Sequence, residues 1–407
     1  MTESGEGMAS STHSAWPPWR LAAEIFWIFL RLGCTSFGGP IAHLAFFRQE
    51  FVDRRRWLDD GRYTDLVALC QFLPGPTSSQ VGMGLGLRRA GLGGAIAAWL
   101  GFTLPSAAIM IALAWGLEPW AGETPDGFLQ GLKIAAVAVV AQAVWGMGRS
   151  LCPDLGRLTL AGLTAVLALA VPSAWGQLGG IVLGALAGLL SFPAEPASVA
   201  QPASLSQGWR ASLVAGVLFL ALLLAPGLTG QGGQVWPLFD AFYRTGSLVF
   251  GGGHVALPLL QSEVVASGWV DAPTFLAGYG AAQAVPGPLF SLAGFLGAAA
   301  SVGPGGAAGG VLCLLAIFLP GMLLVVAALP HWDRLSRMRR TQTALKGVNA
   351  AVVGLLLAAF YDPVWTSAIR GAPDFSLALI AFLVLTQWRL PPWLVVLCSA
   401  LAGWAFL

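Results

Sequence analysis

Charged side chains are scarce in this sequence. Aspartate, glutamate, lysine and arginine together make up 10% of the 407 residues, whereas a soluble domain carries about 25%. A helix crosses the hydrocarbon core of a membrane with about 20 apolar residues. Five stretches contain no charged residue and are each long enough for at least one crossing: 66–87, 90–117, 158–194, 211–239 and 272–330. Because these stretches are apolar on every side, they exclude a soluble protein and disfavour a membrane β-barrel.

Sequence signatures of enzymes, metal sites and nucleic-acid binding are also missing. The five cysteines have no Cys-x-x-Cys spacing and lie mostly in apolar runs, which favours buried packing over disulfides or metal binding. The net charge of +2 gives no reason to expect a nucleic-acid partner. Because no His-Glu-x-x-His, Gly-x-Ser-x-Gly or phosphate-binding loop occurs, we expect no enzyme activity, no catalytic residues, no metal and no cofactor.

Glycine and proline, in contrast, are abundant, with 53 and 26 residues. Both are tolerated in membrane helices, and the stripe Gly180-x-x-x-Gly184-x-x-x-Gly188 predicts two helices in close contact. The apolar pattern predicts an all-α polytopic membrane protein with about thirteen transmembrane helices. These are expected near residues 21–39, 63–87, 92–117, 128–149, 158–172, 176–192, 210–226, 235–253, 274–299, 306–330, 342–361, 374–388 and 392–407.

One segment between the first two expected helices has a different composition. Residues 43–62 combine five arginines with acidic and aromatic side chains. Such a mixture is typical of a helix that lies along the membrane surface. We therefore expect an amphipathic interfacial helix over this segment.

An internal repeat relates the two halves of the chain. The pattern Gly-x-x-x-Phe-Gly-Gly at 33–39 returns at 246–252, and Gln-Phe-Leu-Pro-Gly-Pro at 71–76 returns as Gln-Ala-Val-Pro-Gly-Pro at 283–288. The separation is about 213 residues in each case. Single residues that share this separation include Arg31 with Arg244 and Glu50 with Glu263. The expected organisation is a flexible cytoplasmic N-terminus (1–20), a first transmembrane domain (21–192), a linker with a connecting helix (193–234) and a second transmembrane domain (235–407).

Loop charges indicate that the two halves have opposite orientations in the membrane. Residues 118–126 contain three acidic and no basic side chains, whereas the corresponding loop at 331–346 contains five basic ones. Positively charged loops stay in the cytoplasm, so these loops should lie on opposite sides. We expect a multi-pass protein of the bacterial inner membrane with its N-terminus in the cytoplasm and its C-terminus in the periplasm.

Two segments in each half interrupt their helices deep within apolar sequence. The first is Phe-Gly-Gly-Pro at 37–40, with Phe-Gly-Gly-Gly at 250–253; the second is Pro-Gly-Pro at 74–76, repeated at 286–288. Backbone groups freed at such breaks cannot face lipid and must be buried in protein or line an aqueous cavity. Matched breaks in two repeats are the pattern that indicates a transporter binding site, while a purely structural kink is the alternative for each.

The first Pro-Gly-Pro is followed by residues that favour an anionic substrate. Thr77 and Gln80 have the spacing of a capping box, so a helix should begin there, and helix N-termini attract anions. Arg31 and Arg244 lie near the first breaks and would supply positive charge, unless they extend to the interface instead. The residues expected to bind substrate are Arg31, Gly38, Gly39, Pro40, Gln71, Pro74, Gly75, Pro76, Thr77, Ser78, Ser79, Arg244, Gly251, Gly252, Gly253, Gln283, Pro286, Gly287, Pro288 and Ser291. Candidates for carrying a coupling proton are His43, His254, Glu50 and Glu263. Either histidine could equally be an ordinary hydrogen-bonded side chain.

Taken together, these motifs resemble the chromate ion transporter family. The resemblance rests on Phe-Gly-Gly-Pro at 37–40, Arg-Arg-Trp-Leu-Asp-Asp at 55–60 and Gln-Phe-Leu-Pro-Gly-Pro at 71–76, with Phe-Gly-Gly-Gly-His and Ala-Val-Pro-Gly-Pro in the second half. It implies the long, two-domain form with antiparallel halves. It also implies export of chromate driven by the proton motive force, which confers chromate resistance. Gly253 stands where the first half has Pro40, so the two breaks need not bend alike.

Two alternative functions remain open from the sequence. Sulfate is a tetrahedral dianion of similar size to chromate, so the chain could instead import sulfate or another inorganic oxyanion. It could also be a membrane subunit that transports nothing. The other partners expected are protons and the lipid bilayer, and pairing of two copies into a homodimer is left open.

Overall fold

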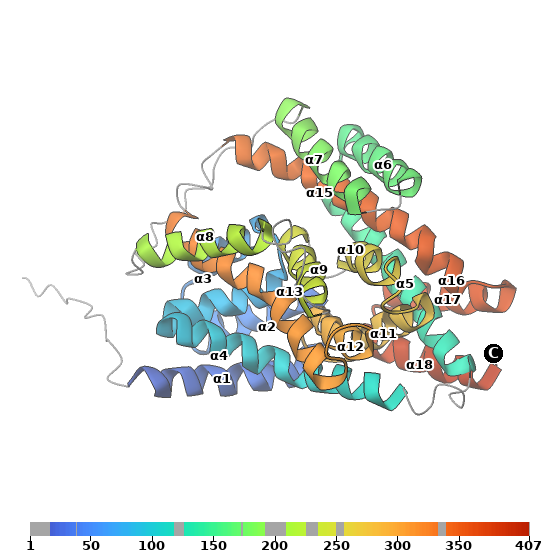
Figure 1. Cartoon of the computed structure of the whole chain (residues 1–407), viewed down its shortest axis with the longest axis horizontal. Helices are drawn as coiled ribbons and strands as arrows, with labels where there is room; N and C mark the ends of the chain where they lie inside the picture. Colours follow the sequence, from blue (N-terminus) through green and yellow to red (C-terminus); the bar gives the residue numbers. More distant parts are fainter. Residues whose placement is uncertain are drawn as a thin grey trace, which may run out of the picture.

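The computed structural model describes residues 17–37, 39–117, 126–171, 174–191, 209–224, 235–249, 256–332 and 339–406. This described part of the chain consists of helices and connecting turns and contains no β-strand (Figure 1). The predicted all-α fold is therefore confirmed. Gly38, Gly251, Gly252, Gly253 and His254, which belong to the predicted sites, lie outside the described residues.

The elements follow one another in the same order in the two halves. The first half contains α1 (Pro18–Thr35), α2 (Gly39–Arg48), η1 (Gln49–Arg54), α3 (Asp60–Phe72), α4 (Thr77–Leu117), α5 (Asp126–Leu151), α6 (Leu155–Ala170) and α7 (Ala174–Ser191). After α8 (Trp209–Leu224), the second half contains α9 (Val235–Leu248), α10 (Ala256–Leu260), η4 (Gln261–Val265), α11 (Ala272–Ala284), η5 (Leu289–Ser291), α12 (Leu292–Ala299), α13 (Gly306–Ala328), η6 (Leu329–His331), α15 (Arg339–Ala359), η7 (Phe360–Trp365), α16 (Thr366–Ala368), α17 (Ala372–Thr386) and α18 (Pro392–Phe406).

Four of the described helical segments are long and apolar enough to cross a membrane unaided, namely 77–116, 130–151, 306–331 and 342–368. The shorter apolar helices have 10–17 residues each, which is below the length of about 20 that a single straight crossing needs. The predicted number of thirteen crossings is therefore not confirmed.

The helices predicted at 63–87 and 274–299 are each divided in two. The first stops at Phe72 and resumes at Thr77, and the second stops at Ala284 before η5 and α12. Both interruptions contain the Pro-Gly-Pro motif, because proline cannot donate the backbone hydrogen bond that a continuous helix needs. These breaks lie inside the protein, where they can be satisfied by other segments of the chain.

The prediction of a single helix over 43–62 is wrong, while its position at the membrane surface stays a prediction. The helical part ends with the π-helix η1 at Arg54, and the chain is not helical again until Asp60. Phe47 and Phe51 are fully buried against Phe29 rather than directed to lipid, with ring centroids 5.4 Å and 5.1 Å from the ring of Phe29. Burial of these aromatic rings fixes one face of the segment against α1, while Arg48, Arg54 and Arg56 on it remain exposed.

In each half, a tight reversal brings two helical arms side by side. Helix α4 has non-helical backbone angles at Ala90 and Gly91, and beyond them Gly94 packs against the backbone of Gly86. In the second half the turn between α12 and α13 places Gly309 against Gly297 in the same way. The two halves therefore share a hairpin that follows the Pro-Gly-Pro break.

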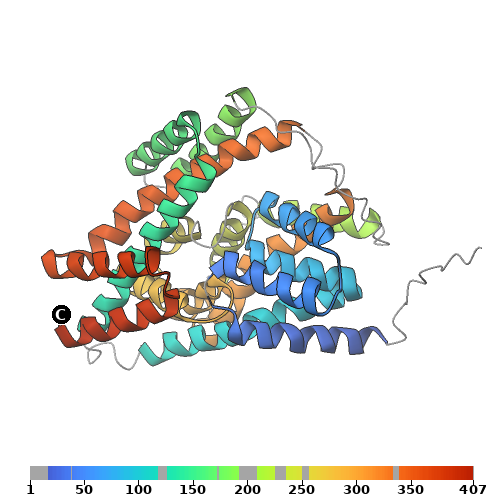
Figure 2. The same cartoon turned by 180° about the vertical axis from the view of Figure 1, so that it is seen from behind.

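The last two helices of each half pack on the other half. Helices α6 and α7 lie along α15, while α17 and α18 lie along α5 (Figures 1 and 2). The predicted stripe of small residues forms part of this contact, because Gly184 and Gly188 of α7 meet the backbone around Gly347 of α15. Gly131 of α5 and Gly403 of α18 make the matching contact. This exchange means that neither half is complete without the other.

We predict that Gly184→Leu loosens the exchanged contact. A side chain at Gly184 would collide with the carbonyl oxygen of Gly347, 2.7 Å from the Cβ position. Overpacking of this kind costs about 1–3 kcal/mol or more, so the melting temperature of the purified protein in detergent should fall. Gly179→Leu on the same helix is the control, because no atom lies within 4 Å of its Cβ position. Equal melting temperatures for the two variants would contradict the observed packing.

Candidate functional site

The breaks of one half meet the breaks of the other. The amide N–H of Gly75 donates a hydrogen bond to the carbonyl oxygen of Val249 at 2.6 Å, and the N–H of Gly287 donates to that of Ser36 at 3.0 Å. Ser36 directly follows α1 and Val249 directly follows α9. Each Pro-Gly-Pro motif therefore satisfies the carbonyl group at the interrupted end of a helix in the opposite half. The two bonds are equivalent by the internal repeat.

Only glycine fits the central position of each Pro-Gly-Pro motif. Gly75 has φ +125° and Gly287 has φ +107°, values that side-chain-bearing residues rarely adopt. The space is also occupied: a Cβ on Gly75 would lie 3.3 Å from the Cα of Gly321, and one on Gly287 would lie 3.0 Å from the Oγ of Ser106. The backbone of each motif thus lies directly against the long helix of the opposite half.

A helix begins immediately after the first motif, as predicted, but not with the predicted capping box. Helix α4 starts at Thr77, and its first repeating bond runs from the N–H of Gln80 to the carbonyl of Pro76 at 2.9 Å. The side chain of Gln80 reaches past Thr77 and donates to the carbonyl of Pro74 at 2.8 Å. Thr77 therefore lies within the first turn instead of capping it. In the second half, η5 and then α12 follow the motif.

His43 joins the two breaks through its ring. Its Nε2 lies 3.2 Å from the carbonyl oxygen of Ser36, and its Nδ1 lies 3.3 Å from the Oγ of Ser78. A carbonyl group only accepts hydrogen bonds, so Nε2 carries the proton, and in a neutral ring Nδ1 accepts from the hydroxyl of Ser78. The Ser36 carbonyl consequently receives both His43 and Gly287. A proton-carrying role for His43 stays a prediction.

Buried polar atoms without a hydrogen-bond partner gather around these breaks. In the described part of the chain they include the Oγ atoms of Ser36, Ser79 and Ser291 and the Oε1 of Gln80. An unsatisfied buried polar group costs about 1–3 kcal/mol, so a cluster of them calls for a ligand or ordered water. Ser79 lies in the first turn of α4, and Ser291 ends η5. Each half therefore brings a hydroxyl group at a helix start.

Comparison with known proteins agrees with this two-fold arrangement. The family model described as chromate transporter matches twice, over residues 23–191 and 236–404. The chain belongs to the chromate transporter family. It is 31% identical to a chromate transport protein of Pseudomonas aeruginosa, over 97% of this chain and 94% of that protein. It is 28% identical to a probable chromate transport protein of Synechococcus elongatus (93% and 94%) and 27% identical to a chromate transport protein of Cupriavidus metallidurans (97% and 95%). No solved structure matches the chain significantly.

In this member of the chromate transporter family, the two arginines predicted to supply positive charge differ in their exposure and in their ion pairs. The side chain of Arg31 on α1 is exposed. Arg244, its counterpart on α9, is held between two carboxylates: its Nε lies 3.1 Å from the Oδ2 of Asp240, and its Nη2 lies 3.0 Å from the Oε2 of Glu263. The positive charge of Arg244 is therefore already matched. Its role in binding an anion remains a prediction.

The two predicted glutamates also differ, although each lies in a π-helical turn. Burial opposes ionisation of Glu50, but hydrogen bonds from Arg55 and Arg54 outweigh this effect and hold the pKa of its carboxyl group below the usual range. The two bonds measure 2.6 Å and 3.2 Å. Glu50 thus stays ionised within its own segment, whereas Glu263 reaches across to Arg244 on another helix. A proton-carrying role for either glutamate is still a prediction.

The other predicted binding residues lie at or near the helix ends on either side of the breaks. Gly39 and Pro40 begin α2, and Pro286 and Pro288 flank Gly287 between α11 and η5. Gln71, near the end of α3, is exposed, whereas the amide nitrogen of its counterpart Gln283 is buried. The two members of this pair are therefore not equivalent in their surroundings.

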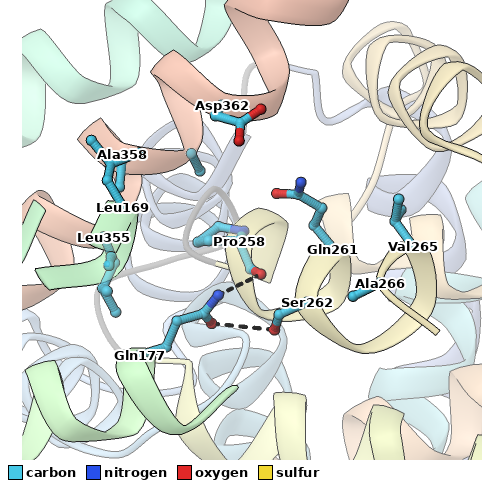
Figure 3. Close-up of a pocket in the computed structure, with 12 residues that line it drawn as sticks. Leu169, Gln177, Pro258, Gln261, Ser262, Val265, Ala266, Leu355, Ala358 and Asp362 are labelled. Atoms are coloured by element: carbon cyan, nitrogen blue, oxygen red, sulfur yellow. Dashed lines mark hydrogen bonds between the residues drawn. The ribbon is translucent and has the colours of Figure 1, made fainter. Parts of the chain in front are cut away.

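A cavity of about 260 Å³ lies between the two halves (Figure 3). Helices α6 and α7 of the first half line it, together with α10, η4, α15 and η7 of the second. Gln177 donates to the carbonyl of Pro258 at 3.1 Å and accepts from Ser262 at 3.4 Å, while Asp362 and Gln261 point into the same space. Asp362 is the only charged side chain of the described lining. Sequence analysis missed this cavity because its walls come from segments far apart in the chain.

We predict that Gly287→Ala destabilises the fold through its backbone. A residue held in a disfavoured backbone region costs about 1–3 kcal/mol, and the new methyl group would also lie against the Ser106 hydroxyl. The melting temperature in detergent should fall. Gly146→Ala is the control: this exposed residue of α5 has nothing within 4 Å of its Cβ position, and its replacement should be neutral or slightly stabilising. An unchanged melting temperature for Gly287→Ala would show that the motif tolerates a side chain.

We predict opposite effects for two buried serines. Ser79→Ala removes a hydroxyl that has no partner, so stability should be retained while chromate flux into inverted vesicles falls at least several-fold. Ser212→Ala removes a hydroxyl that donates to the carbonyl of Ala327, so stability should fall by about 1 kcal/mol with flux per folded molecule unchanged. Normal flux in Ser79→Ala would remove Ser79 from the substrate site.

Proposed function

We propose that this chain exports chromate from the cytoplasm across a bacterial inner membrane, driven by the proton motive force, and thereby confers chromate resistance. Membership of the chromate transporter family and relatives named chromate transport proteins support this proposal. The proposed organisation has two inverted transmembrane domains at 21–192 and 235–407, with the N-terminus in the cytoplasm and the C-terminus in the periplasm.

The observation that carries the proposal is the cluster of unpaired polar groups where the two halves cross. An oxyanion offers only acceptor oxygens, so a site for it must provide donors. The first turn of α4 offers backbone N–H groups with the positive end of a helix dipole. The unpaired hydroxyl groups of Ser79 and Ser291 lie at the two helix starts, whereas the hydroxyl of Ser78 is held by His43. Neutral donors of this kind bind a dianion and still let it leave.

An asymmetry in the packing supports transport by alternating access. The long helices α5 and α15, on which the last two helices of the opposite half pack, contact α11 and α10 respectively, both near the start of the second half. We call α5, α6, α7, α15, α17 and α18 together the exchanged helices. The equivalent contacts, of α15 with α3 and of α5 with α2, are not formed to a comparable extent. We propose a second state in which these helices pack against α2 and α3 instead. Because the halves are related by the repeat, that state opens the site to the other side.

We predict that inverted membrane vesicles containing this protein accumulate chromate when energised. Vesicles without the protein are the control, and sulfate in excess is the competitor. Accumulation that depends on energisation and resists sulfate would support chromate export. Full suppression by sulfate would make another oxyanion the substrate. A lack of any oxyanion flux from purified, folded protein would instead favour a membrane subunit that transports nothing.

A further inference from the structure

A cluster with unequal charge lies on α9 and η4. Arg244 contacts both Asp240 and Glu263, at 3.1 Å and 3.0 Å. The side chains of Asp240 and Glu263 are only 10% and 17% exposed. The second carboxylate oxygen of Asp240 is buried and has no hydrogen-bond partner. Two carboxylates against one guanidinium leave one negative charge without compensation in a poorly hydrated place.

Among the described residues, no other charged side chain is placed to compensate the excess negative charge of this cluster. Helices α10 and α13, which pack on α9, contain no acidic or basic residue, and Cys313 of α13 is buried. On α8, Arg210 is exposed and stacks on Trp209. Beside η4, Asp271 accepts hydrogen bonds from Thr274 at the start of α11. The phenol of Tyr243 on α9 donates to the carbonyl of Phe219.

The first half shows that the repeat does not require this cluster. Trp27 stands at the position equivalent to Asp240, Arg31 is exposed, and Glu50 is paired with Arg54 and Arg55 instead. Equivalent backbone positions therefore carry a self-contained ion pair in one half and a cluster with an excess carboxylate in the other. Such a difference between repeats points to a task that only the second half performs.

We propose that the cluster of Asp240, Arg244 and Glu263 binds one proton whenever the transporter binds one oxyanion, and that the two move in the same direction. A dianion that attracts the guanidinium of Arg244 leaves a buried carboxylate without its partner. Such a carboxylate takes up a proton, because burial disfavours its charged form. A cavity lies beside η4 and is lined by Gln261 and Ser262, the two residues that precede Glu263 in the chain (Figure 3).

This inference rests on the proposed function and fixes the sign of its coupling. A dianion accompanied by one proton carries a single negative charge. The membrane potential, negative inside, drives that charge outward, while the pH gradient, acidic outside, opposes it. The electrical part of the proton motive force is then the part that exports chromate.

The test measures steady-state chromate accumulation in inverted vesicles at a fixed, inside-positive potential set with potassium and valinomycin. Making the bath one pH unit more acidic than the lumen should raise the accumulation ratio about tenfold, because one pH unit is about 1.4 kcal/mol for one proton. The ratio is an equilibrium quantity, so differences in protein level do not affect it. Glu263→Gln should lose the tenfold response, and Asp240→Asn provides a second, independent variant. Glu24→Gln is the control and should keep the response, because this exposed carboxylate on α1 lies 3.5 Å from Arg55 and outside the cluster.

The outcomes separate the two proposals. Chromate accumulation in the wild type without any response to the pH gradient would overturn the coupling inference and leave the export function standing. The same follows if both variants of the cluster keep the tenfold response. No chromate accumulation in the wild type at any potential would overturn the proposed function itself.

Discussion

The architecture depends on two hydrogen bonds that cross between the halves, from Gly75 to Val249 and from Gly287 to Ser36. A helix that stops within a membrane leaves carbonyl groups that water cannot reach, and each costs several kcal/mol unless another group satisfies it. Each half has such a stop and also a motif whose glycine N–H is free to donate. Because the donor of one half serves the acceptor of the other, the breaks can exist only in the paired protein.

The sequence could predict the elements of this arrangement but not their partners. Charge-free runs revealed the membrane helices, and Pro-Gly-Pro located the divided ones, including the helix start at Thr77. Residue patterns report which face of a helix is apolar, not which helix covers it. The packing of α6 and α7 on α15 could therefore not be predicted, although the glycine stripe on α7 predicted that this helix makes a close contact. The break in the helix over 43–62 was not predicted, because the pattern of charged and aromatic residues gave no signal for where the helix ends.

Residue equivalence between repeats was a better guide to backbone than to chemistry. Gly75 and Gly287 are equivalent by the repeat and donate equivalent hydrogen bonds to the opposite half. Gly184 on α7 and Gly403 on α18 each allow a close contact with a helix of the opposite half. Arg31 and Arg244 match equally well in sequence, yet one is exposed and the other holds two carboxylates. Asp240 escaped notice because its equivalent is Trp27. Backbone geometry must be preserved for the halves to fit together, whereas side chains at equivalent positions are free to take on separate tasks.

The contacts of α5 with α11 and of α15 with α10, and the charge cluster of Asp240, Arg244 and Glu263, all involve the second half and have no equivalent of comparable extent in the first. The two differences are physically linked. Helix α15 packs on α10, and α10 continues directly into η4, which carries Glu263. Movement of α15 away from α10 would release η4 and change its distance from Arg244 on α9. A proton on the cluster weakens the same ion pair. By thermodynamic reciprocity, if the position of the exchanged helices alters proton affinity, the proton must alter the position of those helices by an equal free energy. The second half thus contains two parts that coupling requires, a contact that can separate and a charge cluster that responds to it.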